Sequence, residues 1–171
     1  PPISTLFPYT TLFRSPGAKR FRYAAEVFRE HESLRGQARQ FAQLGIELVD
    51  ASGPAADAEV IAVLVEALAA CGLSGFTVAL GDVAVLSALL EVSGCDELWR
   101  AEVFSAVHDS NLVELDRLSR AEGVAEEVGS ALREVVRTRG GLEAIEACAA
   151  VMRRFGREDV LGELAATWEL L

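Results

Sequence analysis

Cysteine and histidine are scarce in this chain, and their scarcity excludes several kinds of site. The cysteines are Cys71, Cys95 and Cys148, and the histidines are His31 and His108. No two cysteines form a C-x-x-C pair and the histidines lie far apart, so we expect neither a zinc site nor any other metal or cofactor. Scattered cysteines of this kind are typical of reduced, small core residues in a cytoplasmic protein.

Long apolar runs and the common enzyme motifs are also missing. No apolar run is long enough to span a bilayer, so we expect no membrane association. There is no G-x-x-x-x-G-K-[ST] loop, no G-x-S-x-G elbow, no H-E-x-x-H and no Rossmann glycine pattern. With 171 residues, of which 51% are hydrophobic and 25% charged, the composition is that of a globular protein able to bury one core.

Charge is unevenly distributed along this chain, whose net charge is −10. Residues 16–50 set six cations against five acids, and the cations are Lys19, Arg20, Arg22, Arg29, Arg35 and Arg39. Residues 51–110 carry Arg100 alone against nine acids. A tRNA-binding protein needs a wide basic surface, so we expect no tRNA partner. The alternative is that the acidity serves solubility and implies nothing about partners.

Two apolar-rich runs near the amino terminus flank a loop dense in Arg, Gln and Glu. Phe21–Phe28 and Phe41–Val49 are predicted to form an antiparallel pair of strands joined by this long polar loop. The pairing brings loop arginines toward the strand side chains of Gln43 and Glu47. Arginine forks suit phosphate or carboxylate, whereas a carboxylate beside an amide suits an ammonium or imidazole group. The site implied binds a small molecule with both features, such as a nucleotide or an amino acid.

The rest of the chain is predicted to be mainly helical, which makes the fold class α+β. Ala55–Ala70 is apolar on most faces, so we expect a largely buried helix that ends at a glycine stop after Cys71. Phe76–Leu80 is predicted to be a short strand and Val83–Val92 a helix. Further helices are expected over Glu97–Val107, Asn111–Ala121, Ala125–Thr138, Leu142–Phe155 and Glu158–Leu171. Candidate caps are Asp96, Asp109 and Ser110.

The loop and its flanking strands resemble a known family. Phe28-Arg29, then Arg39-Gln40-Phe41, then Gln43-Leu44-Gly45-Ile46-Glu47 are similar to motif 2 of the class II histidyl-tRNA synthetases. The stretches FREHESLRGQARQF and FTVALGDVAVLSALL resemble the synthetase-like regulatory subunit of ATP phosphoribosyltransferase more closely than they resemble a working synthetase. The resemblance covers roughly residues 18–171 and is most specific over 22–90. It implies a fragment of the class II antiparallel-sheet core followed by a helical insertion.

The resemblance also implies roles for individual residues. Arg29 stands where the synthetases contact the α-phosphate of ATP, and Phe41 where they stack adenine. Gln43 and Glu47 stand where they hold the α-amino group of histidine. Two positions depart from the synthetases: His31 replaces a glutamate, and Gln37 replaces a loop arginine that reaches the γ-phosphate. Losing a cation there removes charge stabilisation, so the nucleotide half of the site is degraded and the amino-acid half is kept.

The function that the resemblance implies is a non-catalytic regulatory subunit for the first step of histidine biosynthesis. It would act with the catalytic ATP phosphoribosyltransferase as a hetero-oligomer, with L-histidine as effector and no catalytic residue of its own. Two alternatives are a fragment of an active histidyl-tRNA synthetase and an interaction domain that binds no ligand. At the residue level, Arg29 is alternatively an ordinary surface arginine, Gln43 and Glu47 a solvated strand face, and Phe41 a core residue.

The sequence suggests four segments. Residues 1–15 are expected to be a non-native tail, because Thr5–Ser15 matches the in-frame translation of a sequencing adapter; a signal peptide is the alternative. Residues 16–95 are expected to be a partial class II core and residues 96–155 a helical insertion. Residues 156–171 are expected to be a helix that leads back to a missing part of the core. We expect truncation at both ends, because the family's first helix and its later RGLDYY and GGRYD stretches are not visible.

Overall fold

The structure is a computed structural model that describes residues 16–29 and 38–171, and its contacts divide the chain into two compact units. The first unit ends at Ser74 and the second begins at Gly75. Strands and helices are both present, as the α+β prediction requires. The expected tail 1–15 and the loop positions His31, Arg35 and Gln37 lie outside the described residues.

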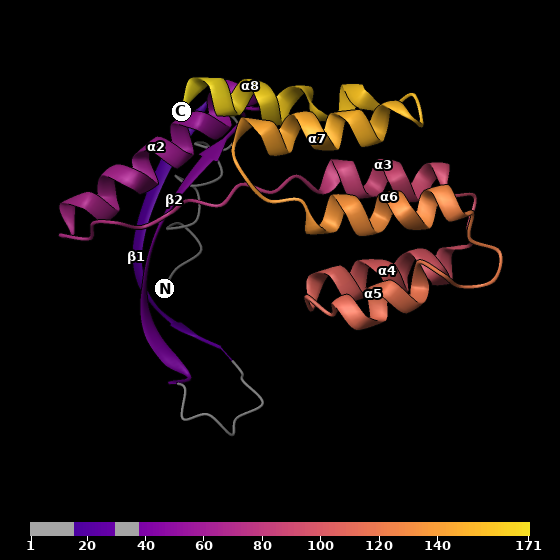
Figure 1. Cartoon of the computed structure of the whole chain (residues 1–171). Helices are drawn as coiled ribbons and strands as arrows, with labels where there is room; N and C mark the ends of the chain where they lie inside the picture. Colours follow the sequence, from indigo (N-terminus) through magenta and orange to yellow (C-terminus); the bar gives the residue numbers. More distant parts are fainter. Residues whose placement is uncertain (1–15, 30–37) are drawn as a thin grey trace. The chain divides into compact units, whose positions relative to one another are not determined.

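The first unit contains the predicted strand pair and one helix. Strands β1 (Lys19–Phe28) and β2 (Gln40–Val49) pair antiparallel, in a register that runs from Lys19 opposite Val49 to Phe28 opposite Gln40. The pair forms a long ribbon (Figure 1). Beyond its last pair, the Arg29 N–H donates to the Arg39 carbonyl at 2.9 Å. The antiparallel prediction is therefore confirmed.

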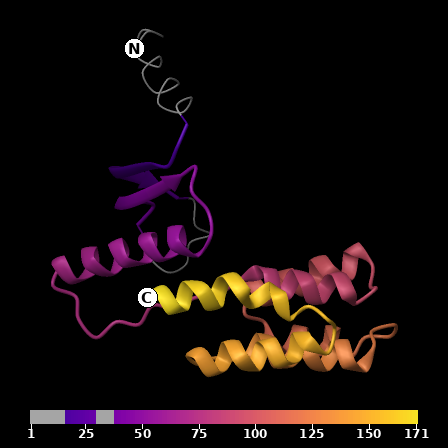
Figure 2. The same ribbon diagram turned by 90° about the horizontal axis from the view of Figure 1, so that it is seen from above.

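Helix α2 (Pro54–Ala70) lies across one face of this ribbon (Figure 2). Arg20 on β1 forms a two-pronged ion pair with Glu59 on α2, in which Nη2 and Oε2 are 2.6 Å apart. Hydrogen bonding from Arg20 holds the pKa of Glu59 below its ordinary value. Because side chains alternate between the two faces of a strand, the opposite face of the ribbon is the one that carries the odd-numbered residues.

The ends of α2 agree with the sequence, but its burial does not. Pro54 begins the helix after Gly53, whose φ is 84°, and Gly72 follows its end with φ of 83°. These are the proline start and glycine stop that local chemistry favours. Ala58 is the one buried residue of the helix, and Val63 and Leu64 are 40% and 47% exposed. The expectation of a largely buried helix is wrong for this unit, since a two-stranded ribbon covers only one side of it.

The strand predicted over Phe76–Leu80 is also wrong. This segment between α2 and α3 has neither strand nor helix assignment in the structure. Its β-rich composition supplies suitable side chains, but a strand also needs a neighbouring strand to receive its backbone hydrogen bonds. Among the described residues, the sheet consists of β1 and β2 alone.

The second unit is helical and has its own apolar core. Its elements are α3 (Val83–Val92), α4 (Glu97–His108), α5 (Leu112–Leu118), α6 (Glu126–Arg137), α7 (Leu142–Arg153), the 3₁₀ turn η2 (Glu158–Leu161) and α8 (Gly162–Leu170). Figure 1 shows α4 beside α5, α3 beside α6, and α7 beside α8. The fully buried core residues are Leu89, Val103, Leu115, Ala131, Leu132 and Met152. The predicted helices are confirmed, with ends that differ by up to three residues; the last begins with η2.

The core places the start of the helical unit earlier than the sequence suggests. Leu89 on α3 belongs to the same core as Leu115 and Met152 from the later helices. Contacts therefore divide the chain at Ser74 and Gly75, whereas the change of pattern in the sequence lies near residue 95. The assignment of residues 96–155 as an insertion stays a prediction.

Caps explain where the middle helices begin. The Asp96 carboxylate accepts from the Trp99 N–H at 2.9 Å, as predicted, and the Trp99 indole donates to the Leu118 carbonyl at 3.1 Å. Helix α5 is capped by Asn111, whose side chain accepts from the Glu114 N–H at 3.1 Å. Ser110 does not cap α5 and adopts a left-handed φ of 54° in the preceding turn, whereas Asp109 is the C-cap of α4, where its N–H donates to the Ser105 carbonyl at 2.9 Å.

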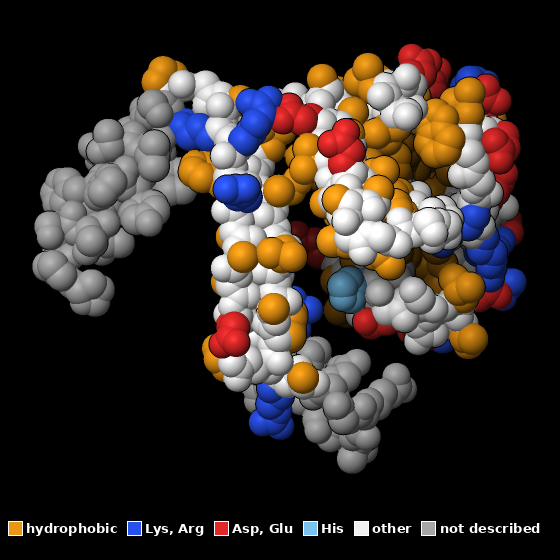
Figure 3. All heavy atoms as spheres, turned by 90° about the vertical axis from the view of Figure 1, so that its left-hand side faces the viewer, with side chains coloured by type: hydrophobic (Ala, Val, Ile, Leu, Met, Phe, Trp, Pro, Cys, Tyr) orange, Lys and Arg blue, Asp and Glu red, His pale blue; other side chains and the backbone are white. Residues whose placement is uncertain are grey.

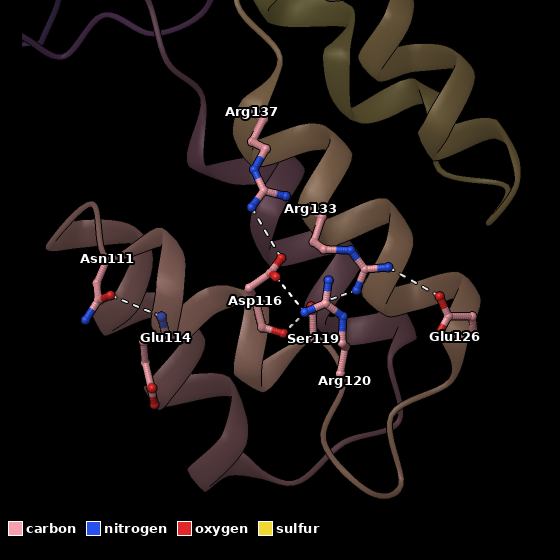
Figure 4. Close-up of polar contacts among 8 residues, drawn as sticks. All are labelled: Asn111, Glu114, Asp116, Ser119, Arg120, Glu126, Arg133 and Arg137. Atoms are coloured by element: carbon pink, nitrogen blue, oxygen red, sulfur yellow. Dashed lines mark hydrogen bonds and ion pairs between the residues drawn. The ribbon is translucent and has the colours of Figure 1, made fainter.

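A close backbone approach joins α5 to α6. A Cβ added to Gly129 on α6 would lie 2.0 Å from the Ser119 carbonyl oxygen. Gly129 is absent from the positions with positive φ, so this glycine is required for space. Next to this contact, Arg133 donates to the Ser119 hydroxyl at 2.8 Å (Figure 4).

An ion-pair cluster extends the same seam. Arg120 and Arg137 both reach Asp116, at 2.6 and 3.3 Å (Figure 4). Desolvation raises the pKa of Asp116, but the hydrogen bonds and charges of the two arginines outweigh it and hold the pKa below its usual value. These ion pairs connect Asp116 on α5 to Arg137 on α6, and this structural role accounts for the cluster.

Candidate functional site

The predicted site residues on the strands share one face of the ribbon. In the observed register Glu47 lies opposite Phe21, and Gln43 lies opposite Ala25. Phe41 precedes Gln43 by two residues on β2 and therefore projects to the same side. We call the side that carries Tyr23, Arg29, Phe41, Gln43 and Glu47 the hairpin face. It is opposite to the face that α2 contacts through Arg20.

Arg29 and Phe41 meet at the loop end of this face. The Arg29 guanidinium carbon lies 5.7 Å from the centre of the Phe41 ring, within the range of a cation–π contact. Arg29 is exposed and Phe41 half-buried. The structure thus brings together two of the predicted nucleotide-site residues, with the guanidinium covering the aromatic ring. The third, Gln37, lies outside the described residues.

Gln43 has a partner that the sequence analysis missed. Its side-chain Nε2 donates to the hydroxyl of Tyr23 at 2.7 Å. Tyr23 lies opposite Gly45, and a Cβ on Gly45 would be 2.2 Å from the tyrosine ring. The signal available in the sequence was this pairing of an aromatic with a glycine across the hairpin, but it becomes visible only once the register is known.

Glu47 completes the hairpin face on the far side of Gly45. Its side chain is exposed, and its carboxylate has no hydrogen-bond or ion-pair partner among residues 16–29 and 38–171. Figure 3 shows Lys and Arg side chains gathered toward the two ends of the ribbon, with hydrophobic side chains between them. On the hairpin face itself, Arg29 offers a cation at the loop end, and Gln43 and Glu47 offer oxygen acceptors along β2, which suits a ligand bearing both an anionic and a cationic group.

Other site chemistries find little support in the described part of the chain. It contains no group of three or more His, Cys, Asp or Glu side chains placed to hold a metal ion. None of its helices is long and apolar enough to cross a membrane. Cys95 and Cys148 are half-buried, but Cys71 is exposed, so the expectation of core cysteines is wrong for Cys71. Burial raises the pKa of the Cys148 thiol, which makes it a weak nucleophile.

The curated proteins that this chain resembles share one name. The chain is 36% identical over 162 residues to the ATP phosphoribosyltransferase regulatory subunit of Moorella thermoacetica, covering 95% of this chain and 42% of that protein. It is 33% identical over 156 residues to the protein of the same name from Thermus thermophilus, covering 91% and 43%. The chain thus spans about two fifths of the length of these relatives.

A solved structure has the same fold. The crystal structure described as an ATP phosphoribosyltransferase regulatory subunit/histidyl-tRNA synthetase from Bacillus halodurans matches with a TM-score of 0.84 and 28% identity, over 99% of this chain and 44% of that one. The hairpin and the helices after it therefore define a protein of the class II aminoacyl-tRNA synthetase fold. The model of the histidyl-tRNA synthetase family matches residues 8–171, and the chain belongs to that family.

Two expectations from the sequence, the origin of residues 1–15 and the roles of the hairpin-face residues, are not tested by the family match. It begins at residue 8, inside the segment 1–15 that was set aside as a tail, so the adapter origin of that segment stays a prediction. The roles of the hairpin-face residues likewise stay predictions.

Proposed function

We propose that this chain is part of a regulatory subunit of ATP phosphoribosyltransferase, which has no ligase activity and senses L-histidine through the hairpin face. Gln43 and Glu47 bind the α-ammonium group of histidine. ATP binds weakly or not at all. The protein works in a hetero-oligomer with the catalytic ATP phosphoribosyltransferase, in the cytoplasm.

The observation that carries the proposal is the shared face of Gln43 and Glu47. The two side chains lie on either side of Gly45 on β2, and both offer oxygen acceptors. An ammonium group has three donors and a positive charge, which a carboxylate and an amide oxygen satisfy together. The names of the curated relatives support the regulatory assignment over a catalytic one.

The loop end of the face supports weak binding of ATP. The Phe41 ring that would stack a purine is covered on one side by Arg29 of the same chain. A nucleotide has to displace this cation–π contact before it stacks, which costs part of its binding free energy. Gln37 in place of an arginine further weakens attraction for the terminal phosphates.

The proposal is tested by reconstitution with the catalytic subunit. We expect the intact protein to copurify with catalytic ATP phosphoribosyltransferase and to confer histidine inhibition on it. The same preparation should show no histidine-dependent exchange of pyrophosphate into ATP. Failure to associate with the catalytic subunit, or no change in its response to histidine, would contradict the regulatory assignment.

The second candidate is a fragment of an active histidyl-tRNA synthetase, and the name of the matching family model favours it. This candidate predicts rapid pyrophosphate exchange that depends on histidine and disappears when Arg29 is replaced by alanine. The exchange assay on the intact protein therefore separates the two functions. Binding of histidine without exchange also excludes an interaction domain that binds no ligand.

A further inference from the structure

Tyr23 occupies the centre of the hairpin face. It lies directly opposite Gly45, which is two residues from Gln43 in one direction and two residues from Glu47 in the other. A Cβ on Gly45 would be 2.2 Å from the Cζ and 2.3 Å from the Oη of Tyr23. Gly45 is not among the residues with positive φ, so its lack of a side chain provides room for the tyrosine ring.

The tyrosine hydroxyl also determines what Gln43 offers to a ligand. Because the Gln43 Nε2 donates to Tyr23 Oη at 2.7 Å, one of its two N–H groups is occupied and the plane of the amide is fixed, which leaves the carbonyl oxygen Oε1 and one N–H for other partners. That oxygen only accepts hydrogen bonds, and the Glu47 carboxylate also only accepts. The Gln43 oxygen, held by Tyr23, and the Glu47 carboxylate are two acceptors on one face, which favour a cation over a carboxylate or phosphate.

We propose that Tyr23 is a positioning residue of the amino-acid site, and that it makes the site selective for ligands with an ammonium group. Its hydroxyl holds the Gln43 amide with the oxygen toward the ligand, and Gly45 provides the room for its ring. Without the hydroxyl the amide rotates freely and presents N–H groups, which oppose an ammonium. The inference rests on the proposed function, because it assumes that an amino acid binds this face.

The test measures two ligands on the intact protein by calorimetry. The first is L-histidine, and the second is imidazolepropionate, in which hydrogen replaces the ammonium group. Tyr23→Phe keeps the ring and removes the hydroxyl, so we expect affinity for histidine to fall about fivefold, the effect of one hydrogen bond. Affinity for imidazolepropionate should not change. Equal losses for both ligands would indicate a merely structural role and would overturn the proposal.

A double-mutant cycle and a test without ligand make the result decisive. In a Gln43→Ala protein, Tyr23→Phe should have no further effect on histidine binding; additive losses would contradict coupling through the amide. In the unliganded protein, Tyr23→Phe should shift the side-chain amide NMR signals of Gln43. Histidine binding that survives Tyr23→Phe unchanged overturns this inference alone. Absence of histidine binding by the unmodified protein overturns the proposed function and this inference with it.

Discussion

Two glycines in the described chain are required for space, and they belong to different parts of the molecule. Gly45 leaves room for the Tyr23 ring, and Gly129 lets α6 approach the Ser119 carbonyl. Neither has a positive φ, so their need is set by a neighbour and not by the backbone conformation. From the sequence, both look like weak points in a strand and a helix, where glycine is normally unfavourable.

We expect Gly129→Ala to destabilise the helical unit by about 1–3 kcal/mol, because the new methyl group overlaps a backbone oxygen that cannot move independently. Gly162 on α8 provides a matched control, since an added Cβ there meets no atom within 4 Å. Gly162→Ala should be neutral or stabilising by up to about 1 kcal/mol. Chemical denaturation of the two variants measures both effects, and equal stabilities would show that the close approach is absent.

The Arg20–Glu59 pair predicts a pH dependence of the contact between the ribbon and α2. The pKa of Glu59 is lowered from its ordinary value of 4.5 in the folded protein, chiefly by hydrogen bonding from Arg20. A lowered pKa means that the stabilisation is fully present above this ordinary value and is lost as the pH falls through the folded value. The protection factors of the amide hydrogens in β1 and α2 of the intact protein, which are corrected for the intrinsic pH dependence of exchange, should therefore fall in acid.

Glu59→Gln removes the titrating group and is the comparison for that experiment. At neutral pH the variant should have lower protection factors than the unmodified protein, and in acid the difference should shrink. A difference that stays constant down to the lowest pH would show that the pair does not stabilise the contact.

The site residues were partly predictable from the sequence, and the limit has a physical cause. Spacing along one strand placed Gln43 and Glu47 on one face, because side chains alternate with a period of two. The partner of Gln43 depends on which residue lies opposite, and register is fixed by pairing that spacing along one strand does not contain. Tyr23 was therefore missed until β1 and β2 were seen paired.

At the scale of elements, local signals predicted helices better than strands. Helices α3 to α7 carry their hydrogen bonds within themselves, so caps and apolar periodicity determine them. The segment Phe76–Leu80 has strand-like composition but no neighbouring strand among residues 16–29 and 38–171, and it is irregular. The burial of α2 was overestimated for a similar reason, since burial depends on how many partners surround the helix.

The start of α5 gives an element-scale prediction. Asn111→Ala removes the side-chain acceptor of the Glu114 N–H and should cost about 0.5–2 kcal/mol. Ser110→Ala, one residue earlier, removes a hydroxyl that caps nothing in α5 and should cost clearly less. Thermal unfolding of both variants compares them. A larger loss of stability for Ser110→Ala than for Asn111→Ala would show that Ser110, as the sequence suggests, is the residue that caps α5.

At the scale of the whole molecule, the two units differ in how many buried apolar residues they contain. The buried apolar residues of the described chain belong to the helical unit, apart from Ala58 on α2. A two-stranded ribbon with one helix has little apolar surface to bury and is marginal by itself. The helical unit has a core drawn from α3 to η2 and does not need the ribbon for it.

We therefore expect residues 75–171 to fold when expressed alone and residues 16–74 not to fold. The helical fragment should show strong helical circular dichroism and a cooperative unfolding transition. The ribbon fragment should show neither a transition nor protected amides. A cooperative ribbon fragment, or a helical fragment that unfolds without a transition, would contradict this division.

The central claim is that the hairpin face binds the ammonium group of an amino acid, and calorimetry of histidine binding to two variants of the intact protein tests it most directly. Glu47→Gln keeps the shape and removes the charge, so affinity should fall by about 10- to 100-fold, the loss of a charge-assisted hydrogen bond. Arg29→Ala should change affinity little, because Arg29 contacts Phe41 at the loop end. If Arg29→Ala abolishes binding while Glu47→Gln has no effect, the amino-acid site does not lie on Gln43 and Glu47.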